Sequence, residues 1–273
     1  MDAWGKNASF QLAAIHRLAD DLVEAAALLD EEPTPVWLKI QQRLPQATVE
    51  ELEGNPEIFL WQGTPLEESH RHHSHLAALC PFNTIQPDDP VWAEVLENSR
   101  RRWIGMGMGN WAGWSMPWAI MLHNRFQQAD MAVTLIDFWR RCYTNSGGGT
   151  LHDPQFGGVS LGLCGNNRVM QMDAGMGMVT AIADLFIYET GGTLYPLHGV
   201  PDSWKNFEVK RICCSNGLRF AAKRANGVTS FTLSATRPVK IRVCVAKKYV
   251  DVELLANQSF KQNINHKKNQ EEN

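Results

Sequence analysis

The residues with the clearest chemical potential lie together in the stretch His70-Arg71-His72-His73-Ser74-His75-Leu76. Arg and protonated His donate hydrogen bonds, and neutral His also accepts them, so this cluster is typical of a site for a hydroxyl-rich small molecule. A second interpretation places some of these imidazoles in the core, on a helix that begins near Ser69 and turns Leu76 and Leu79 inward. The sequence leaves both interpretations open for each histidine.

A metal site is a third interpretation, because His70 and His73, or His72 and His75, are spaced to share one face of a helix. The Glu or Cys that usually accompanies such a pair at a fixed spacing is missing. We therefore expect no metal ion here, and no cofactor is indicated elsewhere in the chain.

Three motifs, taken in order, give the chain a resemblance to a known family. The histidine stretch resembles the H-R-H-x-S-H-L signature of glycoside hydrolase family 95, the inverting α-L-fucosidase and α-L-galactosidase family with an (α/α)6 barrel. The second motif is Gly113-Trp114-Ser115, with Trp118 at the start of an apolar helix. The third is Gln171-Met172-Asp173 before Ala174-Gly175-Met176-Gly177, which keeps the Gln and Asp of the family's Q-I-D-G-N-F-G and lacks its Asn and Phe.

The resemblance implies roles for individual residues. Asp173 matches the family Asp that polarises an Asn pair acting on the attacking water, so it is the catalytic candidate. Arg71 and His72 match the family's sugar-binding pair, and His70 and Trp114 are further candidates for substrate binding. The implied partner is an oligosaccharide or glycan.

Inverting hydrolysis also needs a carboxylic acid on the other side of the sugar, about 6.5–9.5 Å from the base. The family's acid Glu and its Asn pair lie upstream of the segment that residues 1–29 resemble, and no position here matches them. We therefore expect a fragment of a hydrolase of terminal α-L-fucosyl or related residues, with little or no activity alone. The alternative is a non-catalytic carbohydrate-binding or scaffold protein, and a rhamnosidase-like or phosphorylase-like relative is a third possibility.

Several candidates carry a second, structural interpretation. Asp173 also suits a helix N-terminus, with its carboxylate bonded to backbone N–H groups near Gly175. Glu67 and Glu68 could replace the missing acid, although exposed Glu residues before a helix more often act as N-terminal charges. The remaining open candidates are Trp111, as a ligand or a core residue, and Asp153 with Asn166-Asn167 in a long Gly-rich loop.

The pattern of apolar residues predicts a mainly α protein. Apolar spacings of three and four predict helices over residues 8–29, 35–44, 91–103, 115–124, 130–143 and 174–189. This is about half of what a closed (α/α)6 barrel requires, so we expect a partial (α/α)6 six-hairpin toroid followed by a small antiparallel β module. The expected divisions are residues 1–195, a β-rich module over 196–256 and a disordered polar tail over 257–273.

Composition narrows the class of protein further. The chain has 273 residues, of which 44% are hydrophobic, and its formal net charge of -3 comes from interspersed signs. Neither nucleic acid nor a membrane is therefore expected as a partner. The first residues lack the basic start and apolar core of a signal peptide, although members of the resembled family are commonly exported, so the compartment and the oligomeric state stay open.

Overall fold

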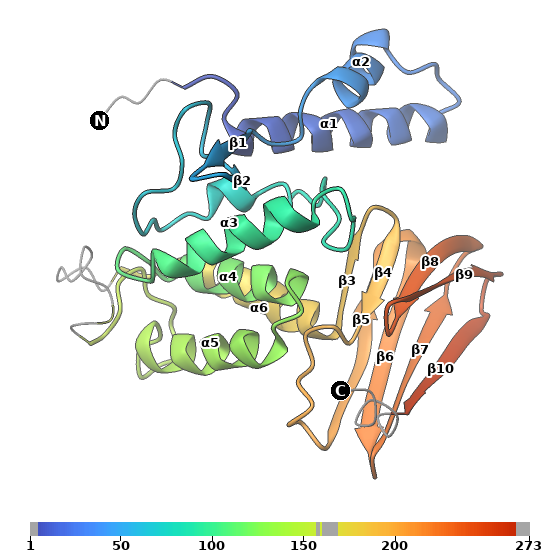
Figure 1. Cartoon of the computed structure of the whole chain (residues 1–273). Helices are drawn as coiled ribbons and strands as arrows, with labels where there is room; N and C mark the ends of the chain where they lie inside the picture. Colours follow the sequence, from blue (N-terminus) through green and yellow to red (C-terminus); the bar gives the residue numbers. More distant parts are fainter. Residues whose placement is uncertain (1–4, 157–158, 160–168, 266–273) are drawn as a thin grey trace.

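The computed structural model describes residues 5–156, 159 and 169–265. Helices dominate as far as residue 186, and the strands that follow gather at one side of them (Figure 1). Within the described ranges, no helix combines the length and the apolar character that a membrane crossing requires.

The helical part contains six α-helices within the described residues. They are α1 (Ser9–Leu28), α2 (Pro35–Arg43), α3 (Ala93–Gly105), α4 (Ser115–Arg125), α5 (Ala129–Cys142) and α6 (Met172–Phe186). Each overlaps a helix predicted from the apolar spacing, because that spacing gives a helix one face to bury. The helix predicted to end at residue 189 instead ends at Phe186, where the chain continues as a strand.

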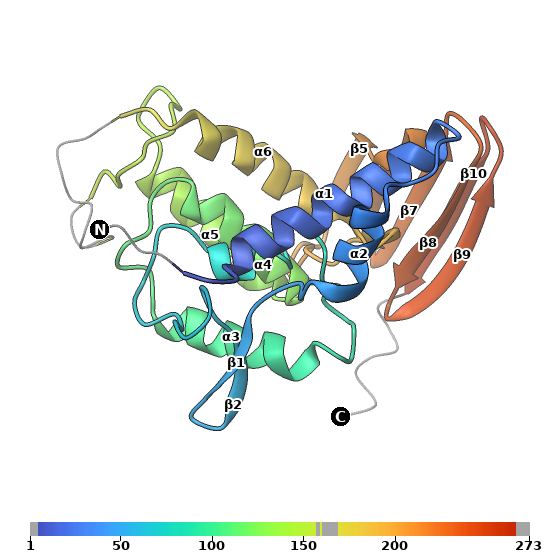
Figure 2. The same ribbon diagram turned by 90° about the horizontal axis from the view of Figure 1, so that it is seen from above.

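Helix α4 is the centre of the helical part, and all of its 11 residues are buried. It packs against both α5 and α6, while α1 and α2 pack on each other at the opposite side from α5 (Figures 1 and 2). A buried ion pair joins Arg125 of α4 to Asp184 of α6 at 2.7 Å, and the guanidinium lies 3.8 Å from the centre of the Tyr188 ring. This pair fixes α6 against α4.

The acidic segment between α2 and the histidine cluster is a hairpin of β1 (Val49–Leu52) and β2 (Asn55–Ile58). The N–H of Ile58 donates to Ser99 Oγ of α3 at 2.8 Å, which docks the hairpin on that helix. Its one buried acid, Glu57, forms an ion pair with Arg102 of α3. The acidic composition is therefore compatible with strands, because the buried charge has a partner.

The β part consists of two 4-stranded sheets with the strand orders β10-β7-β6-β5 and β3-β4-β8-β9. Their bounds are β3 (Ile187–Thr190), β4 (Thr193–Pro196), β5 (Phe207–Cys213), β6 (Leu218–Ala225), β7 (Val228–Ala235), β8 (Val239–Val245), β9 (Lys248–Leu254) and β10 (Ser259–Asn265). All neighbouring strands are antiparallel except β4 and β8. The strands begin before the expected boundary at residue 196, because Ile187 and Leu194 already belong to the core between the sheets.

The prediction of a disordered tail from residue 257 is wrong for Ser259–Asn265. This segment is β10, which pairs with β7 along its whole length and packs Phe260 and Ile264 against the core of the β part. Composition was misleading because an edge strand needs only one apolar face, and its polar residues occupy the other. The rest of the predicted tail, residues 266–273, lies outside the described residues.

Candidate functional site

The histidine cluster separates into buried and exposed members. His73 and His75 are buried, with 1% and 2% of their surface exposed, whereas His70 and His72 are exposed. The helix expected from Ser69 is absent, and only a 3₁₀ turn, η1 (Ser74–Leu76), follows an irregular backbone. The core interpretation therefore holds for His73 and His75, and the other two imidazoles are accessible to a ligand.

Each pair of histidines spaced for a metal site contains one buried and one exposed ring, because the backbone is not helical there. Among the residues that the structure describes, no group of three or more His, Cys, Asp or Glu side chains is placed to hold a metal ion.

His73 anchors the cluster to the core. Trp103 donates its indole N–H to Nδ1 of His73 at 3.0 Å, so the neutral ring carries its proton on Nε2, which donates to the Ser115 carbonyl at 3.0 Å. Burial lowers the pKa of His73 to about 3, which keeps the ring neutral at pH 7. The rings of Trp111 and Trp118 pack edge-on against it, and Trp111 is 5% exposed. Trp111 is therefore a core residue rather than a ligand residue.

His75 is buried without a hydrogen-bond partner for either ring nitrogen within the described residues. Burial lowers the pKa of His75 to about 3, so this ring is also neutral at pH 7. A crevice that borders His75, His70 and His72 is too narrow for a water molecule. A sugar can therefore contact this cluster only at its exposed edge.

His72 lies within electrostatic reach of Asp173, although the two residues are far apart in the sequence. Partial burial lowers the pKa of His72, and the positive charges of Arg71, His70 and His152 lower it further. The carboxylate of Asp173 acts in the opposite direction and raises the pKa of His72. These effects place one carboxylate and several basic side chains within electrostatic reach of His72.

Asp173 is the second residue of α6, and its side chain is exposed. Its Oδ1 accepts the N–H of Ala174 at 3.0 Å. Gln171 occupies the N-cap position, so the expected contact with backbone N–H groups near Gly175 is replaced by this closer one. The first turn of a helix favours a negative charge, which suits an ionised carboxylate at this position.

Trp114 is tied to the start of α6 from the loop before α4. Its backbone N–H donates to Gln171 Oε1 at 2.8 Å, and its ring packs on Gly177 of α6, where a Cβ atom would overlap the ring. A Cβ at Gly113 would overlap the Leu151 carbonyl, so the neighbouring position also requires glycine. Close backbone packing therefore holds Trp114 beside the helix that carries Asp173.

A His-Asp pair, His152 and Asp153, lies next to these residues, and only Asp153 was a candidate from the sequence. His152 Nδ1 lies 2.6 Å from Asp153 Oδ1, and Asp153 is 6% exposed. The adjacent His and Asp in a Gly-rich loop were the available signal, but the pairing that positions them is not visible in the sequence. Asn166 and Asn167, named with Asp153 in the sequence analysis, lie outside the described residues.

Glu67 and Glu68, the proposed substitute acids, are exposed on irregular backbone. Neither precedes a helix, so the expectation of an N-terminal helix charge does not hold for them.

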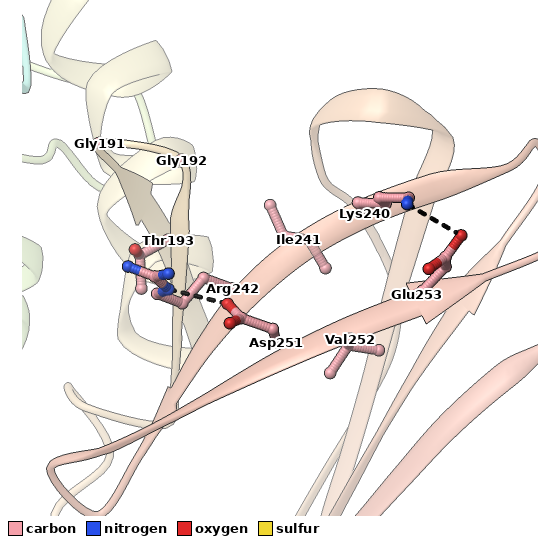
Figure 3. Close-up of a pocket in the computed structure, with 9 residues that line it drawn as sticks. All are labelled: Gly191, Gly192, Thr193, Lys240, Ile241, Arg242, Asp251, Val252 and Glu253. Atoms are coloured by element: carbon pink, nitrogen blue, oxygen red, sulfur yellow. Dashed lines mark hydrogen bonds and ion pairs between the residues drawn. The ribbon is translucent and has the colours of Figure 1, made fainter.

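The β part carries an open groove of about 490 Å³ that contains none of the candidate residues (Figure 3). Its charged side chains already pair across strands β8 and β9, with Arg242 at 2.9 Å from Asp251 and Lys240 at 3.3 Å from Glu253. Each of the four charged side chains that line this groove therefore already has a partner of opposite charge.

Comparison with known proteins gives two matches. The model of the glycosyl hydrolase family 95 catalytic domain matches residues 3–186, well over half of the chain. The chain is also 24% identical over 261 residues to alpha-L-fucosidase 2 of Arabidopsis thaliana. That alignment covers 93% of this chain and 30% of the plant protein, so the chain spans less than a third of its relative's length.

Proposed function

The chain belongs to glycosyl hydrolase family 95, and from this premise we propose that it forms part of a site for a terminal α-L-fucosyl residue of a glycan. Asp173 belongs to the catalytic set and acts on the water of an inverting reaction. Arg71, His72 and His70 bind sugar hydroxyl groups, and the Trp114 ring contacts an apolar sugar face.

The observation that carries this proposal is that His72 and Trp114, from separate segments of the chain, each interact with the start of α6, where Asp173 lies. The Trp114 backbone bonds to the residue that caps α6, and the Asp173 charge acts on His72. Hydrogen-bond donors, an aromatic ring and a carboxylate at one place are the groups that carbohydrate binding and hydrolysis need.

We further propose that the general acid is supplied from outside the segment resembling the family. Within the described residues, Glu67 and Glu68 are exposed on irregular backbone, and Asp153 is buried and bonded to His152. Such a carboxylate does not suit proton donation to a leaving group. Loss of general acid assistance lowers the rate by about 10²–10⁴-fold, so the chain alone should turn over slowly or not at all.

An apolar face on α6 supports the proposal that more chain completes the site and the partial (α/α)6 arrangement. Met172, Met176, Val179 and Ile182 recur along one side of this helix and are 62%, 66%, 69% and 42% exposed. Exposed apolar residues in a continuous stripe usually contact another segment or protein. The stripe begins next to Asp173, where an opposite wall of the pocket would be needed.

The test is L-fucose binding together with hydrolysis of an aryl α-L-fucoside. At a concentration of about 100 times Kd, L-fucose should stabilise the chain by about 2.7 kcal/mol. R71A should abolish this stabilisation, and the control R101A, which alters an exposed arginine of α3, should retain it. An unstabilised wild-type chain would refute the sugar site, and turnover comparable with intact glycosidases would refute the missing acid.

The alternative is a carbohydrate-binding protein without catalysis, and the exposure of Asp173 favours it, because active sites usually exclude water from their catalytic groups. The D173N variant separates the two functions. Residual hydrolysis above the uncatalysed rate that disappears in D173N supports the hydrolase. Binding without any hydrolysis sensitive to D173N supports the binding protein.

A further inference from the structure

The His152-Asp153 pair has the geometry of a positioned imidazole. Asp153 accepts the Nδ1–H of His152 at 2.6 Å, which is short for a hydrogen bond between a ring nitrogen and a carboxylate. Only 8% of the Asp153 side chain is exposed, whereas 34% of the His152 side chain is exposed. The acid is therefore on the inner side of the pair, and the imidazole is on the solvent side.

The backbone places His152 between the segments that form the candidate site. Its carbonyl accepts the N–H of Gly113 at 2.8 Å, next to Trp114. Its N–H donates to the Val169 carbonyl at 3.0 Å, and the preceding residue, Leu151, forms a bridge with Met170. His152 is thereby attached to both the loop of Trp114 and the backbone that leads directly into α6.

A carboxylate can only accept a hydrogen bond, so its contact with Nδ1 requires that this nitrogen carry a proton. In the neutral ring, Nε2 then has a free lone pair. Within the described residues, the hydrogen bond from Nδ1 to Asp153 is the one that the His152 ring makes. A positive charge on His152 would also lower the pKa of His72, as expected for neighbouring groups.

We propose that His152 is a further sugar-binding residue of this site, and that Asp153 is its positioning residue. Asp153 holds the ring in the Nδ1–H tautomer, so that Nε2 accepts the hydrogen of a hydroxyl group on the bound α-L-fucosyl unit. This inference rests on the proposed function, because it assigns one more contact to the same sugar. A purely structural pair would bury the imidazole or occupy both of its nitrogens.

The first test compares H152Q with H152F by the dissociation constant for L-fucose. Gln places an amide group close to the position of Nε2, whereas Phe keeps the ring shape and removes both nitrogens. H152F should weaken binding about tenfold, the usual loss for one hydrogen bond, and H152Q should restore most of it. Equal losses in the two variants, or no loss in H152F, would overturn the proposal.

The second test addresses the role of Asp153. Nitrogen-15 spectra of the His152 ring should report the Nδ1–H tautomer in the wild-type chain and a mixture of tautomers in D153N, with L-fucose shifting the Nε2 signal in the wild type. The matched control is D251N, which removes the carboxylate of an exposed pair on β8 and β9 and should change neither signal. A wild-type ring protonated at Nε2 alone would contradict the positioning role. Should D153N fail to fold, H152Q and H152F still decide the binding role.

The same measurements separate this inference from the proposed function. If the wild-type chain binds L-fucose and R71A does not, but H152F binds normally, only the role of His152 is refuted. If the wild-type chain does not bind L-fucose, the proposed function is refuted, and the inference is refuted with it.

Discussion

The packing of Trp114 on α6 predicts the outcome of replacing two glycines on the same helix. Gly175 and Gly177 both lie within α6, and alanine in a helix interior is more favourable than glycine by about 1 kcal/mol. Helix propensity alone therefore predicts that G175A and G177A stabilise the protein equally. Their surroundings differ, so we expect opposite outcomes.

The magnitude follows from what an added methyl group would meet. At Gly177, the new Cβ would overlap the Trp114 ring, lying 3.0 Å from its Cε3, and would also be 3.2 Å from Pro117 Cγ. Both neighbours are in packed surroundings, and overpacking of this kind costs about 1–3 kcal/mol. At Gly175, the nearest atom is Thr150 Cγ2 at 3.1 Å, which a small shift can relieve. We expect the free energy of unfolding of G177A to be about 1–3 kcal/mol lower than that of G175A.

The assay is urea unfolding followed by circular dichroism, with both variants compared with the wild-type chain. In a W114A background, which removes the ring, G177A should become neutral or stabilising, so the double-mutant cycle isolates the contact. G177A should also weaken L-fucose binding, because the displaced ring belongs to the proposed site. Equal unfolding free energies for G175A and G177A would refute the reasoning, as would an unchanged effect of G177A without the ring.

Two further predictions concern buried charge. D184N leaves a buried guanidinium without its anion and should lower the free energy of unfolding by about 3–5 kcal/mol. D137N breaks only exposed pairs of α5 and should lower the free energy of unfolding far less, and urea unfolding of the two variants tests this difference. The pKa values of His73 and His75 are about 3 in the folded chain, well below the ordinary 6.5. Between these two pH values the unfolded chain binds protons that the folded chain does not. The free energy of unfolding should therefore fall as the pH drops from about 6.5 towards about 3. Within that window, each of the two histidines adds about 1.4 kcal/mol per pH unit to the slope of the unfolding free energy against pH. H75L should reduce this slope by that amount, and the control H70Q, at an exposed histidine, should not. Equal slopes in H75L and the wild type would count against the burial of the His75 ring.

The helices were predictable because their information is local. In α1 and α5, apolar residues recur at spacings that match one buried face, and polar or Pro-containing breaks separate the segments. The end of α6 could not be predicted from the spacing of apolar residues. Ile187 and Tyr188 continue an apolar pattern, but they pair with β4, and such pairing is a long-range property.

The strands show the same division between local and long-range information. The alternation in β6 and β7 was visible, because each of these strands has one face in the core. Strand β10 was missed, since its sequence is mostly polar and its stability comes from pairing with β7 and from Phe260. Composition over a short window does not distinguish an edge strand from a disordered segment.

The candidate site depends even more on contacts between distant segments. The family resemblance named Arg71, His72, Trp114 and Asp173. Of these, Trp114 bonds through its backbone to Gln171 at the start of α6, and the Asp173 charge acts on His72. The resemblance does not reveal His152, because its place at the site comes from backbone contacts with Gly113 and Val169 on either side.

The histidine motif contains both buried and exposed imidazoles, and the sequence alone does not distinguish them. His73 and His75 are neutral and buried, so they support the backbone of the motif from its buried side. His70 and His72 remain exposed because the chain is irregular and turns successive side chains to different sides. A substitution at His73 would therefore impair sugar binding indirectly, by releasing the Ser115 carbonyl and the start of α4. Loss of binding after mutation of this motif therefore identifies a ligand contact only when the variant is shown to be folded. H152Q and H152F alter a partly exposed ring, so they test a sugar contact more directly than substitutions at His73 do.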